Sequence, residues 1–173
     1  AYTFFYAQGR AIGRSLLEED KVDLARDILK QAEGKGLQFL LPVDNVVADE
    51  FDAGATTRVV SGDHIEDPWM GMDIGPETCK LFADVIAGAG TVVWNGPLGC
   101  FEMEPFARGT QAVAEAIAAS DAVSVIGGGD SASAIKKAGL ADRMTHISTG
   151  GGASLEFLEG KALPGVVALS DTA

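Results

Sequence analysis

The run VIGGGDS, residues 125–131, is the strongest local signal in this chain. A short apolar run ends at Ile126, three glycines follow, and an Asp-Ser pair begins a stretch of helical character. Glycine has no Cβ, so its backbone N–H groups can approach an anion, and the start of a helix adds a partial positive charge. A tight turn with an N-cap needs fewer glycines. We therefore expect a phosphate-binding turn at the carboxyl end of a buried strand, formed by Gly127, Gly128, Gly129, Asp130 and Ser131.

The two residues that close this motif each have a candidate role. Asp130 either caps the helix or holds a hard cation such as Mg²⁺ through its carboxylate oxygens. Ser131 can add a hydroxyl to a bound phosphate.

Two further turns share this design. The run TGGGAS, residues 149–154, follows the next short apolar run. The run VWNGPLGCFE, residues 93–102, leaves an earlier one and offers the amide of Asn95, the rigid apolar ring of Pro97 and the carboxylate of Glu102. Ligands of doubly wound folds bind at the carboxyl ends of the strands. The alternative for residues 93–102 is a loop with Asn-Gly turn chemistry and a solvated glutamate.

The apolar pattern around these turns predicts an α/β protein. Short β-rich runs alternate with amphipathic stretches, which is typical of βαβ units. We expect a doubly wound, Rossmann-like parallel sheet with helices on both faces. Because the chain opens on an expected helix, residues 3–17, the first strands are expected to be missing. The expected strands are residues 37–41, 91–94, 122–126 and 145–148, with a small peripheral pair of Asp44–Ala48 and residues 59–60. The expected helices are residues 22–33 after an Asp20 N-cap, 77–89 after Pro76, 106–119, 131–138 and 153–158.

Composition narrows the functional classes. The chain has 173 residues, a formal net charge of −12 and 22 glycines. This acidity argues against sequence-independent nucleic-acid binding, which needs a basic surface. No apolar run approaches the ~20 residues that span a bilayer, so no membrane contact is expected. Two cysteines, Cys79 and Cys100, cannot form a disulfide framework, so a cytoplasmic protein is expected.

The remaining reactive residues carry weaker signals. His64, His146 and Cys100 lie in no recognisable triad or metal spacing, so structural roles are favoured. The acidic loop of Asp63, Glu66 and Asp67 is interpreted as a solvated face. Neither a Walker P-loop nor a dinucleotide fingerprint occurs.

Four ordered motifs resemble the phosphoglycerate kinase family. They are WMGMDIGPET at residues 69–78, WNGPLGCFEMEPFARGT at 94–110, IGGGDS at 126–131 and THISTGGGASLEFLEGKALPGV at 145–166. The similarity runs from Ala1 to Asp171. It implies that residues 1–173 are a partial C-terminal nucleotide-binding domain. Such enzymes transfer a phosphoryl group between 1,3-bisphosphoglycerate and ADP, giving 3-phosphoglycerate and ATP in glycolysis, with Mg²⁺.

The resemblance also assigns roles to residues. Gly71 and Met72 would wall the adenine, and Glu102 would bind the ribose hydroxyls. Asn95, Pro97 and Gly99 would line the nucleotide and phosphate path, with Asp130 on the metal. The backbone N–H groups of Gly129 and Gly152 would stabilise the transferring phosphoryl group.

The resemblance implies limits as well. The family's phosphoglycerate-binding N-terminal domain and its catalytic lysine segment have no counterpart in this sequence, so we expect the chain alone to be inactive. The full-length parent is expected to be monomeric. Two alternatives stay open: a nucleotide-binding module or remnant without turnover, and an unrelated nucleotide- or sugar-phosphate-binding protein with similar glycine turns.

Overall fold

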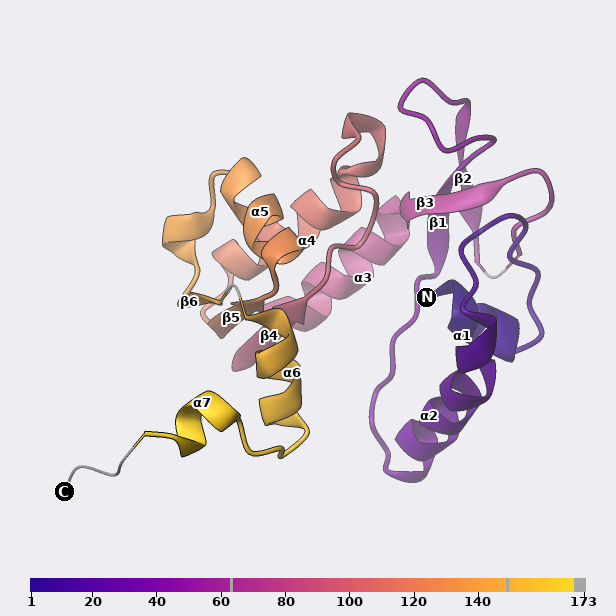
Figure 1. Cartoon of the computed structure of the whole chain (residues 1–173). Helices are drawn as coiled ribbons and strands as arrows, with labels where there is room; N and C mark the ends of the chain where they lie inside the picture. The colour runs from indigo at the N-terminus through magenta and orange to yellow at the C-terminus, as the bar shows by residue number, and fades with distance from the viewer. Residues whose placement is uncertain (63, 149, 170–173) are drawn as a thin grey trace. The chain divides into compact units, whose positions relative to one another are not determined.

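A computed structural model of the chain describes residues 1–62, 64–148 and 150–169 (Figure 1). The chain forms two compact units, the first made of Ala1–Asp84 and Leu98–Val113 and the second of Val85–Pro97 and Ala114–Ala173. In the described part, the fold is mixed α/β, with one three-stranded antiparallel sheet, one three-stranded parallel sheet and seven α-helices. The expected single parallel sheet is therefore only partly confirmed. None of the helices in the described ranges is long and apolar enough to cross a membrane.

The first unit is built on the antiparallel sheet. Its central strand β1 (Asp44–Ala48) lies between β2 (Thr57–Ser61) and β3 (Met70–Ile74). The expected pairing of β1 with residues 59–60 is confirmed, with Val46 opposite Val59.

Strand β3 was not expected. Its apolar side chains at positions 70, 72 and 74 alternate with Gly71 and Asp73, which is the period of a strand. Met72 packs with Ala48 and Phe106 in the core of this unit. The alternation was therefore visible in the sequence.

A buried carboxylate ties helix α3 (Pro76–Ala87) to β1. Asp44 Oδ1 accepts the Thr78 N–H at 2.8 Å, and Oδ2 accepts the Glu77 N–H at 3.0 Å. The Thr78 hydroxyl in turn accepts the N–H groups of Val43 and Asp44, at 3.0 and 3.1 Å. A side chain from a neighbouring strand thus satisfies first-turn N–H groups that the helix itself leaves without acceptors.

The expected long helix at residues 3–17 is mostly wrong. Helix α1 spans only Tyr2–Ala7 and packs against α2 (Val22–Gly34) (Figure 1). Beyond α1 the backbone turns at Gly9 and Gly13, where φ is +79° and +53°. A Cβ on Gly13 would also collide with the carbonyl oxygen of Trp69. Tertiary contact therefore overrides the local helical pattern there.

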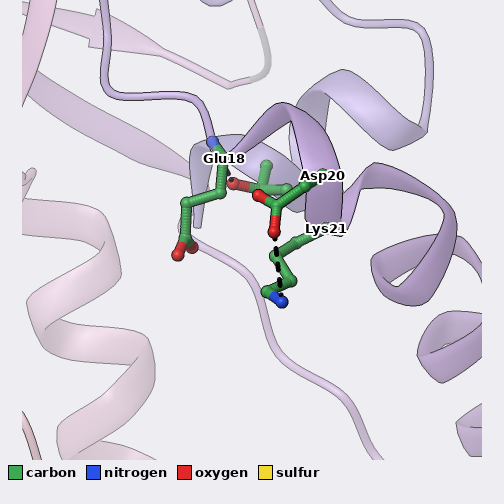
Figure 2. Close-up of polar contacts among 4 residues, drawn as sticks. Glu18, Asp20 and Lys21 are labelled. Atoms are coloured by element: carbon green, nitrogen blue, oxygen red, sulfur yellow. Dashed lines mark hydrogen bonds and ion pairs between the residues drawn. The ribbon is translucent and has the colours of Figure 1, made fainter.

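Asp20 does not cap α2, contrary to expectation. It lies in a short 3₁₀ turn, Glu19–Lys21, and the N-cap position is Lys21, with no side-chain cap hydrogen bond. In this turn the Asp20 carboxylate forms an ion pair with Lys21 Nζ at 3.2 Å (Figure 2). The preceding Glu18 N–H donates to Thr3 Oγ1 at 3.4 Å, which joins this turn to α1.

Residues 37–41 (LQFLL) form no strand, which corrects another expectation. Phe39 packs against Phe4 with ring centroids 5.1 Å apart, and Phe39 and Leu41 line a pocket of about 370 Å³. A strand needs a neighbour that supplies ladder hydrogen bonds, and no described strand pairs with this run. The apolar character of residues 37–41 was therefore not enough to predict a strand.

The second unit contains the parallel sheet, in the order β4 (Thr91–Asn95), β5 (Val123–Gly127) and β6 (His146–Ser148) (Figure 1). All three strands were expected within two residues. Helices α5 (Gly129–Lys137) and α6 (Gly151–Leu158) follow β5 and β6 directly, as predicted.

The remaining elements connect or extend these layers. Helix α4 (Arg108–Ala119) follows the 3₁₀ turn Glu104–Phe106, so the expected helix at 106–119 is confirmed with a later start. The 3₁₀ turn Ala141–Arg143 precedes β6, and α7 spans Pro164–Val167.

Replacing Thr78 by Val should lower the free energy of unfolding by about 2–4 kcal/mol, because the buried N–H of Asp44 and the partly buried N–H of Val43 lose their acceptor while side-chain volume is kept. Urea denaturation followed by circular dichroism measures this. Thr57→Val, at an exposed position of β2, is the matched control and should stay within about 0.5 kcal/mol of the parent chain. Equal losses for the two variants would contradict the role given to Thr78.

Candidate functional site

The three parallel strands of the second unit end side by side. The register places Asn95 opposite Gly127, and Gly127 opposite Ser148. The next residue, Gly128, donates its N–H to the carbonyl oxygen of Ser148 at 3.1 Å. The turns after β4, β5 and β6 therefore meet at one edge of the sheet, as the sequence predicted.

Two glycines allow the turns to approach this closely. Gly128 has φ +94°, and a Cβ there would lie 2.9 Å from Asn95 Oδ1. A Cβ on Gly151 would lie 2.7 Å from the Cα of Gly128. Both positions exclude a side chain for structural reasons, quite apart from any ligand.

Two other glycines face open space. A Cβ on Gly129 or Gly152 would meet no heavy atom within 4 Å. Both residues are exposed and lie in the first turns of α5 and α6, where no side chain caps either helix. First-turn N–H groups have no intrahelical acceptor, and the helix dipole favours an anion there. The pair of helix starts is therefore suited to phosphate oxygens.

Ser131 has a different place from the one expected. It is fully buried, and its hydroxyl oxygen accepts the N–H of Gly96 at 2.8 Å. The carbonyl oxygen of Gly96 accepts the Trp94 Nε1–H at 2.6 Å. Ser131 thus ties the turn after β4 to α5, and its expected contact with phosphate stays a prediction.

Asp130 is exposed in the first turn of α5. In the described ranges no group of three or more His, Cys, Asp or Glu side chains could hold a metal ion by itself. A single carboxylate fits Mg²⁺, which binds through one or two carboxylates and takes further oxygens from phosphate and water. Thr149, the first residue of the second glycine motif, and Asp63 of the acidic loop lie outside the described residues.

The residues expected at the adenine belong to the first unit and have protein contacts there. A Cβ on Gly71 would collide with the ring of Tyr2, and the Gly71 N–H donates to Ser15 Oγ at 2.9 Å. Met72 is 4% exposed, within the core. Packing within the first unit accounts for a glycine at position 71 and a methionine at position 72. Their contact with adenine therefore stays a prediction from the family resemblance.

Gly99 and Glu102 lie on the loop 98–103, which rests on a buried carboxylate that sequence reasoning missed. Asp73 is 1% exposed, and its Oδ2 accepts the N–H of Gly109 at 2.7 Å. A Cβ on Gly99 or Gly109 would collide with the Asp73 carboxylate. Burial raises the pKa of Asp73 to about 6, although hydrogen bonds from Gly109 and Ile74 act in the opposite direction. The sequence offered only a weak signal for this role of Asp73, namely an aspartate that alternates with apolar residues in the run 70–74.

Glycine-rich strand-to-helix turns at the carboxyl edge of a parallel sheet are typical of phosphate-binding α/β proteins. The phosphoglycerate kinase family model matches residues 1–161. The chain therefore belongs to the phosphoglycerate kinase family.

Relatives and solved structures agree with this assignment. The chain is 60% identical over 171 residues to the phosphoglycerate kinase of Clostridium novyi, covering 99% of this chain and 43% of that protein. The phosphoglycerate kinase structure from Coxiella burnetii superposes with a TM-score of 0.91 at 46% identity, covering 96% of this chain and 43% of that one. That from Pyrococcus horikoshii gives 0.82 at 36% identity, covering 97% and 42%. The chain thus spans less than half the length of the relatives it matches.

Gly151→Ala should lower the free energy of unfolding by about 1–3 kcal/mol, since its methyl group would overlap the backbone of Gly128. Gly152→Ala is the matched control one residue away, where the methyl group enters open space, and should change stability by less than about 0.5 kcal/mol. Urea titrations of both variants without ligand decide this. A destabilised Gly152→Ala with an unchanged Gly151→Ala would contradict the packing described.

The pKa of Asp73 gives a pH-dependent prediction. Since burial raises this pKa above its unfolded value, the folded chain holds the proton more tightly, and stability from this group falls as pH rises from about 4 to about 6. The parent chain should therefore lose roughly 3 kcal/mol relative to Asp73→Asn across that window. Unfolding free energies of both chains between pH 4 and 7 measure it. A difference between the parent chain and Asp73→Asn that stays constant across this window would contradict the raised pKa.

Proposed function

We propose that residues 1–173 carry the adenine-nucleotide half-site of a phosphoglycerate kinase, as a partial C-terminal domain. The proposed reaction of the whole enzyme is the reversible transfer of a phosphoryl group between 1,3-bisphosphoglycerate and ADP, giving 3-phosphoglycerate and ATP. The observation that carries the proposal is the pair of uncapped helix starts at Gly129 and Gly152, both open to solvent on one edge of the parallel sheet.

The proposed roles in the second unit follow from backbone chemistry. The N–H groups of Gly129 and Gly152 donate to the oxygens of the transferring phosphoryl group, where negative charge needs fixed donors. Gly127 and Gly128 bring the backbone close to the phosphates, and Ser131 holds the turn in place. Asn95 and Pro97 line the phosphate path.

Asp130 would hold Mg²⁺, which when bound neutralises phosphate charge. The carboxylate sits in the same helix turn as the Gly129 N–H, so one short segment would serve both purposes.

The proposed roles in the first unit rest on the family resemblance. Glu102 would accept hydrogen bonds from the ribose hydroxyls, Gly99 would line the nucleotide path, and Gly71 and Met72 would contribute to the adenine wall. The phosphoglycerate substrate would bind to parts of the family's fold that this chain does not match. We therefore propose that the isolated chain binds nucleotide without turning over.

Calorimetric titration of MgADP into the purified chain tests this proposal, with intact mass confirmed on the same sample. We expect saturable binding, and Gly129→Ala should weaken it by at least about tenfold, because a methyl group then occupies the space in front of the helix start. Gly165→Ala, also in open space but in α7, is the matched control and should bind as the parent does. A folded chain of correct mass that does not bind MgADP would overturn the proposal.

A further inference from the structure

A short loop of the first unit, residues 98–103, is held by buried polar side chains from two other elements. We propose that Thr110 and Asp73 are positioning residues that fix this loop and thereby set the place of the Glu102 carboxylate for an adenine nucleotide. This inference rests on the proposed function and adds to it two residues that do not themselves touch the ligand.

The first anchor is the Thr110 hydroxyl, at the start of α4. It is 3% exposed and accepts the N–H of Leu98 at 3.0 Å and that of Gly99 at 3.4 Å. The next residue, Cys100, donates its N–H to the carbonyl oxygen of Met72 in β3 at 3.0 Å. Three successive backbone N–H groups of the loop are thus bound to α4 and β3.

The second anchor is the Asp73 carboxylate, which lies where Gly99 and Gly109 come together. Both glycines leave room for it, since a Cβ on either would collide with the carboxylate. Its Oδ2 binds the Gly109 N–H at 2.7 Å, so the same group fixes the first turn of α4, which carries Thr110. Asp73 therefore supports the loop both by contact and through the helix that bears the other anchor.

The loop presents one charged side chain. Phe101 is 6% exposed and Met103 packs against the core, whereas Glu102 between them is exposed. The buried Phe101 on one side and the partly buried Met103 on the other fix the backbone at Glu102 and leave its carboxylate exposed. Such preorganisation matters for a carboxylate that must meet two ribose hydroxyls, because an ordered group loses less entropy on binding.

Thr110→Val tests the inference in the full 173-residue chain, with Cys79 replaced by Ala so that thiol labelling reports on Cys100 alone. Burial raises the pKa of the Cys100 thiol in the closed loop. Loss of the two accepted hydrogen bonds should speed Cys100 labelling by about fivefold or more and weaken MgADP binding by about tenfold. Thr110→Ser keeps the hydroxyl and should restore both values. Asp73→Asn should likewise speed Cys100 labelling and weaken MgADP binding.

A double-mutant cycle with Glu102→Ala separates positioning from general destabilisation. If Thr110 acts through Glu102, Thr110→Val should change MgADP affinity by less than about twofold once Glu102 is absent. An equal loss of affinity in both backgrounds, unchanged Cys100 labelling in Thr110→Val, or failure of Thr110→Ser to restore binding would each overturn the inference. A parent chain that labels slowly at Cys100 yet binds no MgADP would instead overturn the proposed function, and with it the role of the loop in binding.

Discussion

The close approach of three backbone segments at Gly128 is the constraint on which the second unit depends. Asn95, Gly128 and Gly151 lie so near one another that two of the three positions have no space for a side chain. This approach is possible because β4, β5 and β6 are parallel and end in register. It sets where α5 and α6 begin, and so places two uncapped helix starts at one edge of the sheet. The proposed phosphate binding then depends on backbone geometry more than on side-chain chemistry.

In the first unit, buried carboxylate oxygens fix where two helices begin. Asp44 accepts N–H groups from the first turn of α3, and Asp73 accepts one from the first turn of α4. In both cases a strand residue caps a helix that begins far along the chain. A buried donor without an acceptor costs about 1–3 kcal/mol, so these contacts specify which helix meets which strand. Consistently, no buried side-chain nitrogen or oxygen in the described residues lacks a partner.

Sequence reasoning succeeded where a local pattern and the fold agree. The strands at 91–94, 122–126 and 145–148 were predicted because short apolar runs flanked by glycine and polar residues favour strands of a parallel sheet. It failed where a partner decides the outcome. Residues 37–41 have the same apolar character but pair with no described strand. Asp20 has the side chain of an N-cap, yet its carboxylate pairs with Lys21. Strand β3 was not predicted, although its apolar side chains at positions 70, 72 and 74 alternate with Gly71 and Asp73.

The sequence alone determined the family, the glycine turns and their order, because these depend on residue types at fixed spacing. Tertiary structure decided which glycines serve packing and which leave space for a ligand: Gly128 and Gly151 touch neighbouring backbone, whereas Gly129 and Gly152 do not. Adjacent glycines of one motif therefore have different roles: one allows close packing, and the next leaves open space. Tertiary structure also decided that Asp73 and Thr110 both lie at the loop 98–103. The two residues are far apart along the chain, and they come together because β3 packs against the start of α4.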